Sequence, residues 1–251
     1  MLQSLQPTAT VGGERTRNGR AMREDAMTIE QRIALGPQFA VLADDTEESI
    51  LGSSLHQGAI TVLHDSLDAC GQGRGLPWFV GNQIRVLIPR SGGRLLTLSP
   101  DLLIHPTLSS GSRDSIIVAA DGPPALVIEI ASPSTARPRD LAERTPRGKP
   151  AAYAALGIAE YLVFDPVGDF VPAGLWARRL GPDGYEPWQP GADGRWHSAL
   201  DISFVPDGSF LRVHDQDGQL VLTGLELRAQ NRRQLDQLAA LEAELRRLRG
   251  E

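Results

Sequence analysis

The chain has 251 residues and 41% hydrophobic content, which is enough to bury one sizeable core. Its net charge of −6 argues against a general nucleic-acid coat, which would be basic, but is compatible with a local basic groove around an acidic site. A single cysteine, Cys70, excludes a disulfide framework and a cysteine-based zinc site.

Targeting and membrane signals are missing from the sequence. No apolar run approaches the roughly 20 residues of a membrane span, and no signal-peptide core stands at the start. No glycine-rich phosphate loop of the nucleotide-binding type occurs either. We therefore expect a cytoplasmic protein with no membrane partner and no nucleotide cofactor.

Three segments differ in composition along the chain. Residues 1–26 are polar, rich in Gly, Thr and Arg, and without helical or strand period, which predicts a disordered N-terminal extension. Residues 27–224 contain the apolar runs and form the expected folded domain. Residues 225–251 are predicted to be helical.

The first half of the folded domain predicts one long helix followed by strands. A broad apolar face that begins near Ser54 and reaches Leu67 indicates the helix. Short apolar or alternating runs then predict strands at residues 78–80, 83–88, 95–98 and 102–104.

The second half reads as strand, helix, strand. Residues 126–130 and 161–164 are apolar strands, and a helix from Lys149 to Leu156 lies between them. Two hairpins are predicted next, over residues 176–188 and 211–222. The expected fold class is α/β with a mixed sheet, added β-hairpins and a C-terminal helix.

The C-terminal helix carries a short leucine seam. Alternating steps of three and four residues connect Leu238, Leu241, Leu245 and Leu248, as in a coiled coil. Carried toward the N-terminus, the seam meets Asn231 and Gln234 and weakens. Two interpretations stay open: the seam packs on the body of its own subunit, or it forms a short coiled coil in a homodimer.

Lys149 is the only lysine in the chain, and all the remaining residues counted as Lys or Arg are arginine. Lysine is a compact, mobile point charge, whereas arginine is a flat fork with five donors. A lone lysine among arginines indicates a site that arginine cannot serve, although one lysine can also survive by chance.

Two carboxylates stand at strands and predict a metal site. Asp101 is at the edge of one strand, and Glu129 lies inside an apolar strand, where glutamate is rare unless it is paired or binds a metal. If the two strands are neighbours, both carboxylates face one pocket and need a cation. Mg²⁺, or Mn²⁺ in its place, suits such a pair. The alternative for Glu129 is an ion pair with an arginine.

Lys149 would act beside this metal. It can orient the attacking water or neutralise developing charge on a phosphate. Tyr153 is four residues further on and shares its helix face, so it can steady the lysine or contact a phosphate; a core role is the alternative. The histidines His56, His64 and His105 lack metal-ligand spacing, which predicts core or surface roles.

A basic segment precedes Lys149 and suits a phosphate backbone. Its cations outnumber Asp140 and Glu143, and the arginines in it are Arg137, Arg139, Arg144 and Arg147. These are the candidates for contact with DNA. Nothing in the segment reads bases, so no sequence specificity is predicted.

These residues together resemble the Uma2 family of the PD-(D/E)XK nuclease superfamily. The resemblance covers roughly residues 28–222 and is carried by Pro100-Asp101, the runs 126–135 and 156–166, the spacing from Lys149 to Tyr153, and the helix segment 55–60. It implies a restriction-endonuclease-like core over residues 27–224. It also implies Asp101 and Glu129 as metal ligands that act in catalysis with Lys149.

Two departures from the superfamily pattern accompany the resemblance. The usual lysine lies two residues after the second acid, where this chain has Ala131; the Uma2 pattern places it on the following helix, where Lys149 stands. The segment 140–148 is longer than usual. Related folds also carry an acid on the first helix, which implies Glu48 near the metal; a solvated acid at a helix start is the alternative.

The leading hypothesis is a Mg²⁺-dependent endonuclease that hydrolyses DNA. The alternative is a catalytically inactive member of the fold that acts as a DNA-binding or protein-interaction module. A third reading, a structural subunit assembled through its C-terminal helix, rests on the leucine seam alone.

Overall fold

A computed structural model describes residues 54–89, 95–108, 111, 113–131 and 148–250 of the chain. Several predictions lie outside these described residues: the N-terminal extension 1–26, the acid Glu48, and the basic segment with Arg137, Arg139, Arg144 and Arg147.

The centre of the fold is a mixed six-stranded sheet. Its strands are, in spatial order, β1 (Phe79–Asn82), β4 (Leu102–His105), β6 (Leu126–Ile130), β7 (Glu160–Phe164), β8 (Leu175–Gly181) and β9 (Gly184–Pro187). β6 and β7 are parallel, and α5 (Lys149–Ala155) lies between them in the chain. All other neighbours are antiparallel. The predicted α/β class, the strand–helix–strand unit and the hairpin over residues 176–188 are confirmed.

Two smaller sheets flank the central one. The first contains β2 (Arg85–Pro89), β3 (Leu95–Leu98) and β5 (Ser115–Ile117), and the short helix α4 (Val118–Asp121) follows it. The second contains β10 (Trp196–His197), β11 (Ser203–Asp207) and β12 (Phe210–His214). A 3-10 turn, η4 (Pro172–Gly174), precedes β8.

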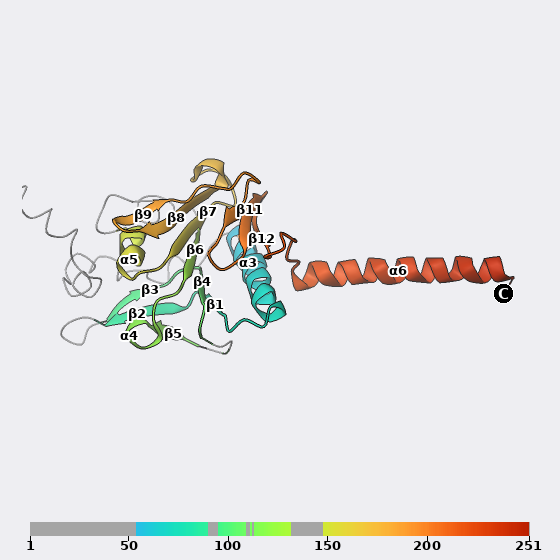
Figure 1. Cartoon of the computed structure of the whole chain (residues 1–251), viewed down its shortest axis with the longest axis horizontal. Coiled ribbons are helices and arrows are strands. Elements are labelled where there is room, and N and C mark those ends of the chain that lie inside the picture. The colour runs from blue at the N-terminus through green and yellow to red at the C-terminus, as the bar shows by residue number, and fades with distance from the viewer. Residues whose placement is uncertain (1–53, 90–94, 109–110, 112, 132–147, 251) are drawn as a thin grey trace, which may run out of the picture.

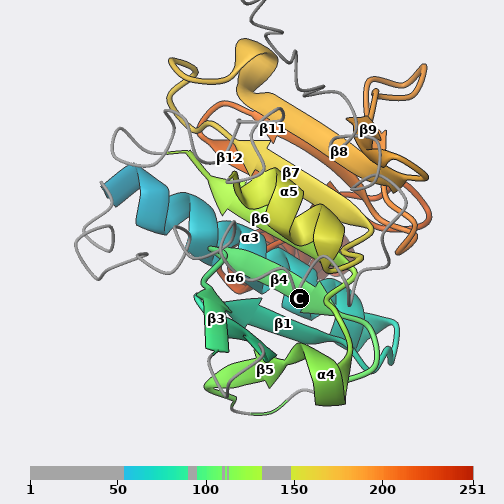
Figure 2. The same cartoon turned by 90° about the vertical axis from the view of Figure 1, so that its left-hand side faces the viewer.

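The alternation of side chains along β6 divides the core into two layers. Leu126, Ile128 and Ile130 belong to one apolar cluster with α3 (Ser54–Gly73) and β12, whereas Val127 belongs to another with α5 and the β2 sheet. Because every residue of β6 is buried, each face of the strand needs its own cover. Figure 2 shows α5 on one side of the central sheet and α3 on the other.

The predicted hairpin over residues 211–222 is present, but only in a short form. β12 pairs along its whole length with β11, which precedes it. After β12 the chain turns and returns antiparallel to it, with a bridge between Leu220 and His214 and a hydrogen bond from the Val221 N–H to the Val213 carbonyl, but residues 219–222 form no full strand. Asp207-Gly208 makes the tighter turn, with Gly208 in the left-handed region at φ 57°. This turn joins β12 to the chain before it.

The C-terminal helix α6 (Gly224–Arg249) leaves the body as a single projecting rod (Figure 1). None of its residues is buried. The interpretation in which its leucine seam packs on the body of the same subunit is therefore wrong. No helix in the described part of the chain combines the length and apolar character of a membrane span.

Glu226 fixes the start of α6 and predicts a pH effect on stability. Its carboxylate accepts hydrogen bonds from the backbone and hydroxyl of Thr223 and pairs with Arg212 at 2.9 Å. Burial raises the pKa of Glu226, but these contacts outweigh burial and leave the pKa below its usual 4.5. A carboxyl group whose pKa is lowered in the folded state stabilises the protein at a pH above its usual pKa. That stabilisation is lost as the pH falls through the lowered pKa.

We therefore expect Glu226→Gln to melt at a lower temperature than wild type at neutral pH, and the two melting temperatures to converge in acid. Thermal unfolding at several pH values checks this. Asp236→Asn removes an exposed acid further along α6 and is the matched control. A wild-type advantage that persists unchanged in acid would contradict the assigned role of the Glu226 charge.

Candidate active site

Glu129 is a buried carboxylate in the middle strand of the sheet. It lies on β6, between Ile128 and Ile130, and its side chain is 3% exposed. Neighbouring Ile128 and Ile130 turn toward α3, so the alternation of a strand turns Glu129 toward α5. A carboxylate in this position requires partners, because an isolated buried charge is strongly unfavourable.

The first turn of α5 supplies those partners. The Lys149 Nζ atom lies 3.2 Å from Oε2 of Glu129, and the Tyr153 hydroxyl donates to Oε1 at 2.7 Å. Lys149 and Tyr153 are four residues apart and therefore share one face of the helix. The sequence placed Lys149 beside the acids, and in the structure its ammonium lies against Glu129 as an ion pair.

Asp101 reaches the same edge of the sheet from β4. In the antiparallel ladder Leu102 faces Ile128, and continuing that register by one residue sets Asp101 opposite Glu129. Asp101 precedes the first residue of β4, so its side chain lies at the end of the two strands. The Asp101 carboxylate accepts a hydrogen bond from the backbone N–H of Ile130 at 2.8 Å, which holds it at the end of β6.

His56 completes the cluster and was not predicted as a site residue. Its Nε2 lies 3.5 Å from Oδ2 of Asp101, and the side chain is 7% exposed. Burial alone would lower the pKa of His56, but a hydrogen bond to Asp101, the charge of Asp101 and the backbone of Ile130 together raise it. The signal in the sequence was its position: His56 shares a helix face with Ala59, Ile60 and Leu63, where a polar residue is unexpected.

The two carboxylates fit a hard divalent cation by number and type of donor. Among the described residues, no three His, Cys, Asp or Glu side chains form a metal-holding group. Mg²⁺ needs fewer protein ligands than such a group provides, since it binds one or two carboxylates and keeps several waters. Asp101 is 18% exposed and so reaches solvent, whereas Glu129 anchors the buried side.

Ala131 confirms the departure noted in the sequence. It stands two residues after Glu129, is 2% exposed and packs in the core with α5. Lys149 reaches the Glu129 carboxylate from the helix instead. A lysine carried by the helix, not by the strand, thus lies beside the second acid.

Tyr153→Phe is expected to lower the free energy of unfolding by about 1–3 kcal/mol, because a buried acceptor loses its donor. Tyr153 is fully buried and its ring lies 5.2 Å from that of Tyr161, so phenylalanine keeps the packing. Chemical denaturation measures the change. Tyr185→Phe, which removes a hydrogen bond to the backbone oxygen of Ile158, is the control for loss of a phenol away from the site. An unchanged unfolding free energy for Tyr153→Phe would contradict the contact.

Two other buried acids serve the fold and lie outside the cluster. Asp165 accepts four backbone N–H groups from residues 167–171 and so shapes the loop before η4. Glu160 accepts from Arg179, the Ser198 hydroxyl and the backbone of Ala199. Their oxygens are used by the protein itself, so burial of an acid is not by itself a mark of the site.

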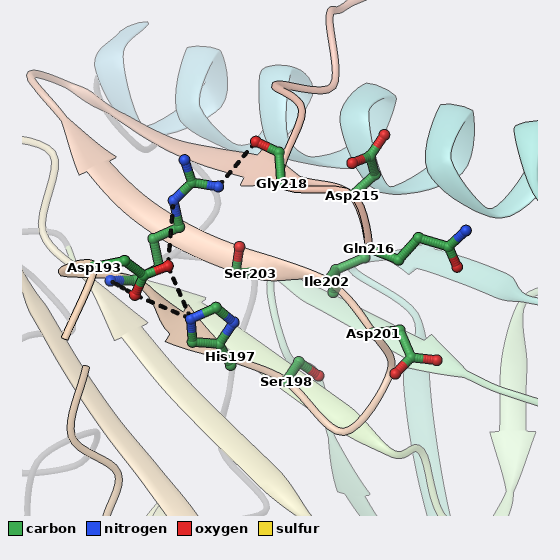
Figure 3. Close-up of a pocket in the computed structure, with 10 residues that line it drawn as sticks. Asp193, His197, Ser198, Asp201, Ile202, Ser203, Asp215, Gln216 and Gly218 are labelled. Carbon is green, nitrogen blue, oxygen red and sulfur yellow. Dashed lines mark hydrogen bonds and ion pairs between the residues drawn. The ribbon is translucent and has the colours of Figure 1, made fainter. Parts of the chain in front are cut away.

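A separate pocket of about 300 Å³ lies beside β11 and is lined by residues between Asp193 and Gly218, not by Asp101 or Glu129. Figure 3 shows His197 turned toward Asp193, and the two are 3.0 Å apart. The neighbouring Ser198 hydroxyl donates to Glu160 instead of to His197. The serine, histidine and aspartate there do not form a nucleophile–base chain.

Comparison with known proteins identifies the family of the chain. The model of the Uma2 family, described as "Putative restriction endonuclease", matches residues 33–174, which is more than half of the chain. This chain belongs to the Uma2 family. The match contains Asp101, Glu129, Lys149 and Tyr153, and it also contains His56.

Among solved structures, the Uma2 chain is similar to a crystal structure described as "a putative nuclease belonging to DUF820 from Anabaena variabilis ATCC 29413". The identity is 12%, the TM-score is 0.37, and the similarity covers 62% of this chain and 74% of that one. No curated protein matches this Uma2 chain.

Proposed function

We propose that this Uma2 protein is a metal-dependent endonuclease that hydrolyses phosphodiester bonds in DNA. The observation that carries the proposal is the convergence of Asp101, Glu129 and Lys149 at one edge of the sheet, from two neighbouring strands and a helix. Family membership supports nuclease activity in general. Metal dependence and DNA as the substrate are our inference from the chemistry of the cluster.

Each residue has a role in this proposal. Asp101 and Glu129 hold Mg²⁺ or Mn²⁺, which when bound activates a water and stabilises charge on a phosphate oxygen. Lys149 supplies a fixed positive charge beside Glu129 and orients the attacking water or neutralises the leaving charge. Tyr153 holds the second oxygen of Glu129 and so sets the direction of that carboxylate.

The basic segment before α5 provides the DNA contact in this proposal. Its arginines, Arg137, Arg139, Arg144 and Arg147, precede Lys149 in the sequence within twelve residues. Cations at that place would bind the phosphate backbone and add no sequence preference. A DNA substrate and one free, buried cysteine favour the cytoplasm as the compartment.

One observation favours a second candidate, an inactive module of the same fold. Both oxygens of Glu129 accept hydrogen bonds or ion pairs from α5, so the cluster is also complete as a buried structural pair. In that case the protein would bind DNA or another protein without cleaving it. The overall negative charge agrees with this alternative.

Cleavage of supercoiled plasmid separates the two candidates. Wild type is incubated with Mg²⁺, with Mn²⁺ and with a chelator, beside Asp101→Asn, Glu129→Gln and the control Asp183→Asn. Asp183 is an exposed acid in the turn between β8 and β9, so its variant loses the same charge away from the cluster. We expect metal-dependent nicking by wild type and Asp183→Asn, and loss of nicking in the other two.

Calorimetric titration with Mg²⁺ and Mn²⁺ gives a second readout that needs no DNA. Binding by wild type that is lost in Asp101→Asn and Glu129→Gln supports the metal site, even if the right DNA substrate is missing from the assay. If wild type does not bind the metal, or if both variants bind it as well as wild type does, the proposed metal site is wrong. The inactive module is then the better candidate.

A further inference from the structure

The α6 helix is held in one direction by its first turn, and none of its residues is buried against the described part of the body. Thr223 and Glu226 form a reciprocal capping box, and Arg212, which is 9% exposed, pairs with Glu226. These contacts fix the exit of the helix from β12 and its neighbours. The remaining turns extend into solvent away from the sheets (Figure 1).

An apolar seam follows one side of this projecting helix. Five leucines at heptad spacing lie on it, with exposed fractions between 48% and 73%: Leu227, Leu238, Leu241, Leu245 and Leu248. Written as a heptad, Leu238 and Leu245 take position a, and Leu241 and Leu248 take position d. Leucines at these positions are typical of a helix covered by another helix.

We infer that α6 pairs in parallel with α6 of a second copy of this chain. Asn231 falls at position a, where an asparagine meets its own copy in a parallel dimer and specifies register. Glu244 at position g and Arg249 at the next position e have opposite charges. In a parallel pair these two positions face each other across the seam, twice by symmetry.

The antiparallel arrangement is disfavoured by the same charges. If the four C-terminal leucines are buried against each other in antiparallel order, the symmetry axis passes near Ala243. Glu242 and Glu244 flank that position and would each lie beside its own copy. Like charges at these positions repel, whereas the parallel pair sets Glu244 against Arg249.

Parallel pairing brings the two bodies to the same end of the coil, because each helix leaves its body at Thr223. Resting on the proposed function, the two sites would then act as a symmetric pair on the two strands of one duplex. The dimer itself does not depend on that function, so its test needs neither DNA nor metal.

Sedimentation equilibrium of the full chain measures the mass directly. We expect a homodimer of the 27.1-kDa chain at micromolar concentrations. Leu241→Glu with Leu245→Glu sets charges in the seam and is expected to weaken association on the order of 100-fold or more. Ala243→Glu adds the same charge on the outer face of the helix and is expected to remain dimeric. A monomeric wild type, or a dimer indifferent to the seam variant, would overturn the inference.

Two further variants test orientation. Leu248→Cys lies near the far end of the helix and is expected to form a disulfide between copies under mild oxidation in a parallel dimer; wild type, with its buried Cys70, is the control. Glu244→Arg is expected to weaken association, and Glu244→Arg with Arg249→Glu to restore it. A dimer that neither cross-links at residue 248 nor responds to the charge exchange is antiparallel and overturns the parallel assignment.

Discussion

Lys149→Arg is expected to lower metal-dependent DNA cleavage by about 100-fold or more, because the charge near the reacting phosphate is no longer held in place. The Lys149 side chain is 7% exposed and its ammonium sits 3.2 Å from Glu129. The planar guanidinium of arginine is wider and presents donors in a rigid fork, so it does not fit where an ammonium fits. Single-turnover cleavage rates measure the loss, and calorimetry is expected to show Mg²⁺ binding largely retained.

Two companion variants interpret that result. Lys149→Met keeps the length of the side chain and removes its charge, and we expect a loss of cleavage of similar size. Arg113→Lys replaces an arginine by a lysine in a partly exposed ion pair with Asp121. This variant is expected to leave cleavage unchanged. Full cleavage by a folded Lys149→Arg protein would mean that the single lysine has no special role.

The local part of the site could be predicted from the sequence because its signals are local. Glu129 is conspicuous as an acid inside the apolar run 126–130, and Lys149 as a lysine in an arginine-rich chain. The apolar runs on either side of α5 predict a parallel strand pair, and β6 and β7 form it. Each of these inferences needs only the period of a helix or strand and the cost of burying charge.

The non-local part could not be predicted in the same way. The register that sets Asp101 opposite Glu129 depends on pairing between β4 and β6, which a sequence pattern does not specify. The meeting of His56 with Asp101 depends in addition on where α3 packs on the sheet. The shortness of the hairpin over residues 211–222 has a related cause, because the sequence pattern does not show that β12 pairs mainly with β11, the strand before it.

The leucine seam is a case in which the sequence predicted the local structure but not its partner. Periodicity predicted the helix and its apolar stripe but left two interpretations of what covers it. The described part of the same subunit does not cover the stripe, since no residue of α6 is buried. Charge at positions e and g, which the pattern already contained, then favours a second parallel copy.

Glu129→Gln is expected to destabilise the protein by about 3 kcal/mol, because removing one partner of a buried ion pair leaves the other charge poorly compensated. Lys149 and Glu129 are both nearly excluded from solvent. Glutamine keeps an acceptor for the Tyr153 hydroxyl, so the change isolates the loss of charge. For a chain of this size the melting temperature is expected to fall on the order of 10 °C.

A double-mutant cycle tests whether the loss comes from the pair. Glu129→Gln with Lys149→Met removes both charges, and we expect it to recover most of the stability, since replacing both partners of a buried pair is often nearly neutral. Glu160→Gln with Lys149→Met is the control, because Glu160 pairs with Arg179. Its two effects are expected to add.

Additive effects in the Glu129–Lys149 cycle would contradict a buried ion pair. The cycle also decides how the cleavage assay is read. An inactive Glu129→Gln protein reports on the metal site only if it is folded at the assay temperature. Because we expect the variant to be destabilised, its folding at that temperature has to be measured. Asp101→Asn avoids the difficulty, because Asp101 is partly exposed and its loss leaves the Lys149–Glu129 pair intact. Loss of both cleavage and metal binding in Asp101→Asn, with an unchanged melting temperature, therefore gives the cleaner assignment of function.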